Sequence, residues 1–419
     1  MTLLNIVNFV PKVQALDKSA ATLAEIRRQL GPVRVLSVIG LTEKHQIERI
    51  DPLVELVAKV SDKVIFAGHS MLQNSALTLL QKNVGDVAMI DKSALVEAID
   101  TFCIHAGRNV FMMPIGSDNG ELNERLVCKA KSANIPILGY FKSLHDKGMG
   151  LSTVPGALSE RKERHHGIRQ IVRCLWQQPS RWSGSEKGRK LSPSQCRWVM
   201  AFNAVHGQKV KEKAGQAHVV EMGYQLLFPG WHELVCQSSY CQIYQSVAQL
   251  EVVLFTRGES PSRPPEENIV PHAYLEQLFE DIVSALDDTG CDWHLRIKPH
   301  PIQDVAFLRG LIVGRSNVEI VFEAPAVLAA TADLAISVYS STVVDTLALG
   351  VPTIEYFFET PFFWRKHPTG SPFPRLGAMK ARSYEVFRQC IQDALQDSSK
   401  GPGKMLDIKP NPNFSFLVK

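Results

Sequence analysis

The sequence lacks any long apolar run. None of its 419 residues falls in a stretch that approaches the ~18 apolar residues a membrane-spanning helix requires. The first residues, MTLLNIVNFVPKVQ, have neither the basic start nor the small-residue cleavage site of a secretion signal. These absences argue against a helical membrane span and against export, and they predict a protein that remains in the cytoplasm.

Cysteine is scattered rather than paired. The eight cysteines include no CxxC pair and no Cys/His spacing suited to zinc. We therefore expect reduced, structural cysteines, and no pattern in the sequence calls for a metal site or a bound cofactor.

The sequence has only a small excess of positive charge, with a formal net charge of +4. Basic residues are nevertheless concentrated between 160 and 213, where Trp176, Trp182 and Trp198 are interleaved with them. Such a segment suits an anionic membrane surface or an acidic glycan acceptor. The alternative is a solvated insertion whose tryptophans belong to the core. Peripheral attachment to the inner face of the plasma membrane is the hypothesis, whereas nucleic acid is disfavoured because aromatic and basic residues do not alternate along a strand.

The length predicts two domains, since single hydrophobic cores stop growing near ~250 to 300 residues. Residues 1–240 alternate short β-branched runs, such as LLNIVNF, VRVLSVIG and NVFMMPIG, with segments of helical spacing, such as KSAATLAEIRRQL. This rhythm predicts a mainly parallel sheet covered on both faces, a Rossmann-like domain that binds the acceptor. The rhythm breaks over 145–215, which is interpreted as a basic insertion.

A second alternating series follows in residues 241–395, from LEVVLFTRG through WHLRIKPHP and ADLAISVYSS to VPTIEYF. It predicts a second Rossmann-like domain, which binds the nucleotide-sugar donor. Residues 396–419 are interpreted as a low-complexity tail. The predicted fold class is α/β, with two Rossmann-like domains facing across a cleft in the GT-B arrangement and ligands at the carboxyl ends of the strands.

The segment KPHP directly follows the predicted strand WHLRI. Pro299 and Pro301 fix the backbone and remove N–H donors, so the side chains of Lys298 and His300 become the available donors. Both cationic side chains suit phosphate oxygens. The alternative is a tight turn with a surface lysine and a packed histidine.

A second polar loop, in SVYSSTVVDTLALG, joins an apolar strand to a helix that ends near Gly350. Ser340, Ser341 and Thr342 stand at the helix start, and Thr342 with Asp345 fits a capping box. Ordinary N-capping needs only one of these residues, so the others are donors for an anion. Together the two loops predict a nucleotide phosphate held between His300 and the serines.

An acidic residue, Glu323, follows the intervening strand and precedes Pro325. A carboxylate in that position can accept hydrogen bonds from ribose hydroxyls, although a solvated loop glutamate fits the sequence equally well.

The first domain needs a general base that activates an acceptor. Asp118, in the loop of MMPIGSDNGEL, follows a strand and stands at the predicted cleft. It can instead N-cap the helix from Asn123 onward. His69, in FAGHSM, is the competing base, and a packed histidine is its alternative.

This ordered set of motifs resembles bacterial GT-B sialyltransferases that use CMP-activated sugars. Those families share an acidic-acidic-glycine motif, an HP motif and an SS motif, which correspond here to DNG at 118–120, HP at 300–301 and SS at 340–341. Glu323 stands where some of these families place a ribose-binding glutamate. This sequence departs at Asn119, where the second acidic residue is expected. The resemblance covers the order and approximate spacing of motifs over both domains.

The resemblance implies an inverting, metal-independent transfer of sialic acid or a related acidic sugar to a glycan or lipid-linked glycan of the bacterial surface. Asp118 would take the acceptor proton, while His300 and the serines would stabilise the departing CMP. KPHP and SVYSSTVVDTLALGVPTIEY also resemble capsule Kdo transferases and CDP-glycerol transferases of wall polymer synthesis. A sugar-nucleotide epimerase and a non-catalytic nucleotide- or glycan-binding module stay open as alternatives.

Overall fold

The computed structural model describes fifteen parts of the chain: residues 3–11, 15–40, 51–67, 87–90, 94–103, 107–116, 120–141, 191–239, 241, 247–259, 264, 268–300, 303–368, 370–396 and 412–418. Three residues of the predicted site, His69, Asp118 and Pro301, lie outside these residues, as does most of the predicted basic insertion.

The first domain is built on a parallel sheet of eight strands in the order β4-β3-β2-β1-β5-β6-β7-β8. Its central strands are apolar and buried along almost their whole length, as a sheet covered on both faces requires. The strands are β1 (Leu4–Val10), β2 (Arg34–Ile39), β3 (Lys63–Ala67), β4 (Val87–Ile90), β5 (Arg108–Ile115), β6 (Ile137–Phe141), β7 (Trp198–Ala201) and β8 (His218–Glu221).

Helices pack on both faces of this sheet and give two separate clusters of buried apolar side chains. They are α1 (Leu16–Leu30), α2 (Asp51–Lys59), α4 (Ala94–Cys103), α5 (Gly120–Ser132), α7 (Ala204–Ala214) and α8 (Pro229–Cys236), with short 3-10 turns η3 (Pro193–Gln195) and η4 (Gln225–Leu227). The sequence analysis assigned residues 191–215 to a basic insertion. The structure instead places η3, β7 and α7 there, as regular parts of this domain.

The second domain has a parallel sheet of six strands in the order β11-β10-β9-β12-β13-β14. Its elements are β9 (Leu250–Phe255), α10 (His272–Asp287), β10 (Trp293–Lys298), α11 (Val305–Leu311), β11 (Val318–Ile320), α12 (Pro325–Ala330), β12 (Leu334–Ser337), α13 (Val343–Ala348), β13 (Thr353–Tyr356), α14 (Pro361–Lys366), α15 (Phe373–Leu376), β14 (Met379–Ala381) and α16 (Tyr384–Gln396). The predicted fold class of two Rossmann-like α/β domains is confirmed.

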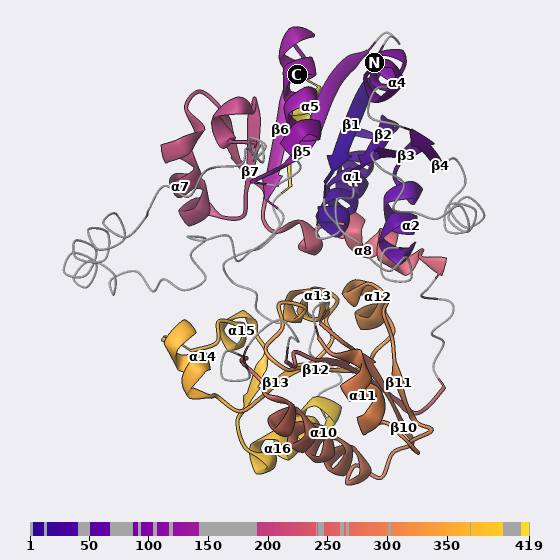
Figure 1. Cartoon of the computed structure of the whole chain (residues 1–419), viewed down its shortest axis with the longest axis vertical. Helices are drawn as coiled ribbons and strands as arrows, with labels where there is room; N and C mark the ends of the chain where they lie inside the picture. Colours follow the sequence, from indigo (N-terminus) through magenta and orange to yellow (C-terminus); the bar gives the residue numbers. More distant parts are fainter. Residues whose placement is uncertain are drawn as a thin grey trace, which may run out of the picture.

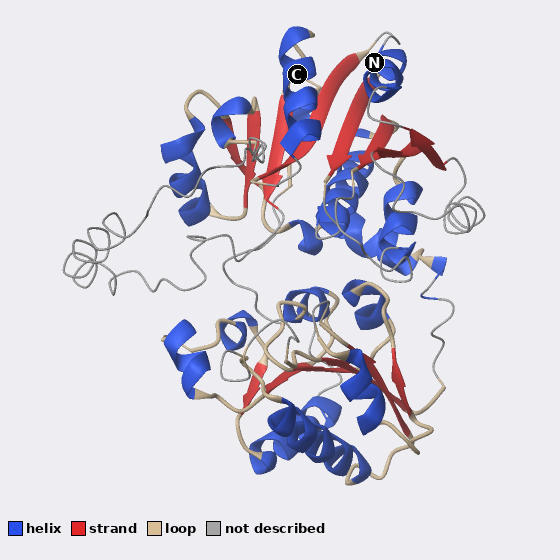
Figure 2. Cartoon of the chain, viewed as in Figure 1, coloured by secondary structure: helices blue, strands red, loops and turns tan. Residues whose placement is uncertain are grey.

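The two domains meet through α8 and η4 of the first and α12 and α13 of the second, which are in contact (Figure 1). The strands of the first sheet point toward the second domain (Figure 2). In the second domain, the carboxyl end of β12 leads through the short loop 338–342 into α13, which touches η4. The carboxyl ends of both sheets therefore face the junction between the domains.

The end of the chain returns to the first domain. Phe414 and Leu417 are fully buried there, and the ring of Phe414 packs edge-on against Phe228, with ring centroids 6.3 Å apart. Two hydrogen bonds with Gln29 of α1 hold this segment, through the Pro412 carbonyl at 2.8 Å and the Phe414 N–H at 2.9 Å. Residues 412–418, grouped by the sequence with a low-complexity tail, are thus part of the packed fold. A short η6 turn (Ser415–Leu417) ends the segment.

No helix in the described residues is both long enough and apolar enough to cross a membrane.

Candidate functional site

The strand order of the second sheet defines a topological switch point. From β9 the chain builds β10 and β11 on one side, then crosses back to build β12, β13 and β14 on the other side. The loops that leave β9 and β12 therefore diverge, and open α/β sheets bind ligands in the crevice this creates. The two polar loops predicted from the sequence follow β10 and β12, on either side of the end of β9.

The turn after β10 is held from within by a buried glutamine. Gln303 is 6% exposed, and its Oε1 accepts hydrogen bonds from the His300 N–H at 3.2 Å and from the Thr256 hydroxyl at 2.6 Å. The Gln303 N–H in turn donates to the His300 carbonyl at 2.9 Å. Lys298 Nζ donates to the Phe322 carbonyl at 3.1 Å. The loop after β10 is thereby tied to the ends of β9 and β11, which leaves His300 half-buried on a fixed backbone.

Gly258, just after β9, allows this glutamine to approach closely. A Cβ at Gly258 would lie 2.6 Å from Gln303 Nε2 and 3.0 Å from Leu275 Cδ2. A methyl group does not fit at these distances unless the glutamine moves. The glutamine cannot move without loosening its bonds to His300 and Thr256.

Gly258→Ala is expected to lower the free energy of unfolding by about 1 to 2 kcal/mol, because it overpacks a buried site and disturbs two buried hydrogen bonds. Denaturant unfolding measures the effect. Gly310→Ala is the matched control, because a Cβ there meets nothing within 4 Å in helix α11. Equal stabilities for the two variants would show that Gln303 does not hold the turn.

The loop after β12 is a compact serine turn. Ser337 Oγ accepts a hydrogen bond from the Ser340 N–H at 3.1 Å, and Ser340 Oγ accepts one from the Thr342 hydroxyl at 3.0 Å. Ser340 is 8% exposed, whereas Ser341 is exposed and Thr342 is half-buried. The serine turn therefore occupies Ser340 internally and presents the Ser341 side chain to solvent.

The capping box predicted for Thr342 and Asp345 is wrong. Thr342 has helical backbone angles, φ −61° and ψ −15°, and its side chain makes no capping hydrogen bond to the start of α13. A capping residue needs an extended backbone so that its side chain can reach the helix N–H groups. The Thr342 hydroxyl donates to Ser340 Oγ instead.

Arg257 was not among the site residues predicted from the sequence; it lies two residues after the end of β9 and so stands between the two predicted loops. Its guanidinium carbon lies 5.6 Å from the centroid of the Tyr339 ring. Tyr339 has a positive φ of 50° and packs against Phe357, Phe363 and Phe373. Burial raises the pKa of Tyr339, against the opposing effect of Arg257. The available signal was the TRG that follows LEVVLF, an arginine beside a glycine at a strand end.

Strand spacing sets how far apart the predicted residues lie. Neighbouring strands are ~4.8 Å apart, so the ends of β10 and β12, two strands apart, are separated by roughly 10 Å. The loops of His300 and Ser341 thus lie on either side of the loop after β9, which carries Arg257. Glu323 lies at the end of β11, on the far side of β10, where its carboxylate accepts a hydrogen bond from the Phe322 N–H at 2.9 Å. It stands beside the Lys298 loop and away from the serine turn.

Buried and half-buried ionisable side chains gather where the two domains meet. Lys18, near the start of α1, pairs with Asp17, and both face Asp345 of α13 in the second domain. Burial raises the pKa of Asp345 to about 7, against the opposing effect of Lys18. Burial alone lowers the pKa of Lys18, but Asp17, Tyr224 and Asp345 together raise it. The junction is therefore a polar boundary beside the serine turn.

Within the part of the chain that the structure describes, no three His, Cys, Asp or Glu side chains are grouped so as to hold a metal ion.

No protein-family model and no curated protein matches this sequence. Among solved structures, one assigned as a UDP-N-acetylglucosamine 2-epimerase from Listeria monocytogenes aligns over 99% of this chain and 94% of its own, with a TM-score of 0.52 and 11% identity. An E. coli heptosyltransferase aligns over 94% and 100%, with a TM-score of 0.42, and the wall teichoic acid polymerase TagF over 96% and 86%, with 0.45; each is 11% identical. At 11% identity, the likeness to the structure with a TM-score of 0.52 shows the fold alone, two Rossmann-like domains.

Proposed function

We propose that this protein is a glycosyltransferase that moves a sugar from a nucleotide-activated donor, and that the donor phosphate binds at the carboxyl edge of the second sheet. The observation that carries the proposal is the arrangement at the switch point, where the His300 turn and the serine turn flank the end of β9 with Arg257 between them. A guanidinium, an imidazole and a hydroxyl that stand at the ends of neighbouring strands suit the charge that develops on a phosphate leaving group.

The order of the HP and SS motifs favours a CMP-activated acidic sugar as the donor, with a glycan or lipid-linked glycan as acceptor. In this proposal His300 and Ser341 stabilise the departing phosphate, Arg257 neutralises it, and Lys298 sets the position of the loop through the Phe322 carbonyl. Asp118 is proposed as the base that activates the acceptor, with His69 as its competitor. Attachment to an anionic membrane surface through residues 160–213 belongs to the same proposal.

An epimerase is the second candidate, because the structure with a TM-score of 0.52 is assigned as a UDP-N-acetylglucosamine 2-epimerase. The two functions differ in their need for an acceptor. An epimerase converts its nucleotide sugar alone and keeps the nucleotide attached in the product. A transferase releases the nucleotide and needs an acceptor for turnover. Incubation with UDP-N-acetylglucosamine alone, followed by NMR of the sugar, separates them.

The wild-type protein is expected to be stabilised by CMP more than by CDP, UDP or GDP. At a ligand concentration about 100 times Kd the gain is about 2.7 kcal/mol, because the ligand binds the folded state only. His300→Ala is expected to weaken CMP binding by about ten- to a hundredfold, since it removes a hydrogen bond to a charged phosphate. Thermal melting with each nucleotide measures both effects.

The control is His218→Ala, which removes an exposed histidine from the other end of the first domain and is expected to leave CMP binding unchanged. Stabilisation by UDP or GDP above CMP would contradict the CMP-sugar donor. If His300→Ala and Ser341→Ala both bind CMP as tightly as wild type, the proposed placement of the phosphate is contradicted.

A further inference from the structure

A large open groove lies at the amino edge of the first sheet, which faces away from the second domain and its candidate site. It has a volume of about 1150 Å³, and Arg108, Ile137, Trp198 and His218 in its lining are the first residues of β5, β6, β7 and β8. These strands are parallel, so their first residues share the amino edge of the sheet, whereas the carboxyl edge faces the second domain. The groove is therefore separate from the proposed donor site.

The returning end of the chain builds one wall of this groove. Asn413, Ser415 and Phe416 line it, and the neighbouring Phe414 and Leu417 are fully buried. Arg108 Nη1 donates to the Leu417 carbonyl at 3.3 Å. Because the segment is anchored on both sides of Phe416, the groove is a fixed feature of the fold.

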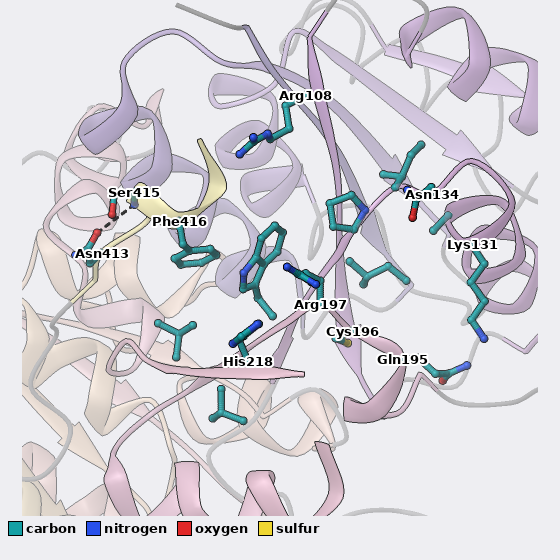
Figure 3. Close-up of a pocket in the computed structure, with 17 residues that line it drawn as sticks. Arg108, Lys131, Asn134, Gln195, Cys196, Arg197, His218, Asn413, Ser415 and Phe416 are labelled. Carbon is teal, nitrogen blue, oxygen red and sulfur yellow. Dashed lines mark hydrogen bonds between the residues drawn. The ribbon is translucent and has the colours of Figure 1, made fainter. Parts of the chain in front are cut away.

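The groove brings together three cationic side chains and a histidine from four separate parts of the chain. Arg108, Lys131, Arg197 and His218 all line it and all are exposed. Figure 3 shows these side chains distributed around one open space, with Lys131 on the side of α5 and Arg108 on the side of β5. None of the described residues that line the groove is aspartate or glutamate. Such a surface attracts a ligand that carries several negative charges.

Aromatic and amide side chains accompany the charge. The rings of Trp198 and Phe416 lie 5.2 Å apart at 48° and are both partly exposed, which gives one aromatic platform on the groove wall. Asn134, Gln195 and Asn413 also line the groove and can donate and accept hydrogen bonds. Sugar rings present both apolar C–H faces, which pack on aromatic rings, and hydroxyls, which pair with amides.

We propose that this groove binds an anionic oligosaccharide, with its acidic groups on the three cationic side chains and the His218 imidazole, and one sugar ring on the Trp198–Phe416 platform. The volume exceeds the ~300 to 1,000 Å³ of sites for single small molecules, which suits a chain of several sugars. A single nucleic-acid strand suits it less, because such strands are held by successive stacked bases and this groove offers one platform. The proposal does not depend on the identity of the donor.

The test is calorimetric titration of the full chain with four probes: a galacturonate hexasaccharide, neutral maltohexaose, inorganic pyrophosphate and a short single-stranded DNA. We expect the acidic hexasaccharide to bind and to weaken as salt rises from about 50 to about 300 mM, because salt screens exposed charges. Pyrophosphate and maltohexaose should each bind at least about tenfold more weakly, since each offers only half of the recognised chemistry.

Arg197→Glu and Lys131→Glu are each expected to weaken hexasaccharide binding by about tenfold, because a reversed charge replaces attraction by repulsion. Both residues are exposed, so folding should persist, which thermal melting checks. Lys63→Glu is the matched control, an exposed lysine at the start of β3 on the same sheet edge but outside the groove. His300→Ala should bind the hexasaccharide normally, so failure of the donor site and failure of the groove are distinguishable.

Three results would overturn the proposal. They are absence of hexasaccharide binding, binding that the two groove variants leave unchanged, and tighter binding of maltohexaose or DNA than of the acidic hexasaccharide.

Discussion

Gly230→Ala is expected to lower the free energy of unfolding by about 2 to 3 kcal/mol, because it forces apart two packed helices. Gly230 lies in α8, and a Cβ there would be 2.8 Å from both the Ala24 carbonyl carbon and the Glu25 nitrogen of α1. These atoms belong to helix backbone, so they cannot rotate away as the end of a side chain can. The Gly230 N–H also donates to Glu25 Oε2 at 2.9 Å, which ties the two helices together at this point.

The expected loss corresponds to a fall in melting temperature of about 5 to 10 °C for a domain of this size. Circular dichroism during heating measures it. Gly310→Ala is again the control, expected to be neutral or to stabilise by up to about 1 kcal/mol, because alanine is the better helix former where nothing is close. If Gly230→Ala melts at the same temperature as wild type, α1 and α8 can move apart with little loss of stability.

This contact also shows how local sequence signals mislead. FPGWHEL reads as a break, because proline and glycine stand together in it. In the structure Pro229 begins α8 at the first helical position, where its missing N–H is not needed. Gly230 then allows a close approach to α1. The same two residues that indicate a turn by local rules therefore start a helix and pack it.

The positions of the central strands follow from patterns in the sequence. Buried parallel strands must be apolar along their whole length, so LLNIVNF, VRVLSVIG and LEVVLF mark β1, β2 and β9 within a residue or two. What the sequence could predict about the site is that both loops end at one sheet edge.

Interactions between distant segments could not be read from the chain. Arg257 becomes relevant only because β9 lies between β10 and β12, and nothing local to TRG states that order. The packing of Phe414 and Leu417 on the first domain joins residues that are far apart in sequence to α1. The groove at the amino edge depends on both sheet order and this return, so the sequence indicated only two of its residues, Arg197 and Trp198 of the basic segment, and not the groove itself.

The buried charges at the domain junction make stability depend on pH in a definite direction. Asp345 is 8% exposed, and its surroundings include Lys18 and Asp17 of α1 and Lys298 at the end of β10. Lys18 already pairs with Asp17, so it supplies Asp345 with only part of a counter-charge. Burial therefore dominates and raises the pKa of Asp345 from 3.8 to about 7.

Asp345→Asn is expected to become more stable relative to wild type as pH rises from about 4 to about 7. In that window the unfolded wild type loses the Asp345 proton while the folded protein keeps it, so wild-type stability falls with rising pH and then levels off above about 7. Asparagine cannot ionise and removes this slope. The upper limit of the relative gain is about 4 kcal/mol, at 1.36 kcal/mol per unit of pKa.

Urea unfolding of both proteins at several pH values between about 4 and about 8 measures this difference. Asp292→Asn, at an exposed aspartate, is the control and should run parallel to wild type. Parallel curves for Asp345→Asn and wild type would mean that Asp345 is ionised throughout, as in a full pair with Lys18. In that case the pair of Lys18 and Asp345 would fasten α1 to α13. If instead Asp345→Asn gains stability over wild type as pH rises, the ionised Asp345 carboxylate is held at the junction at a cost in free energy, which favours separation of the domains above about pH 7.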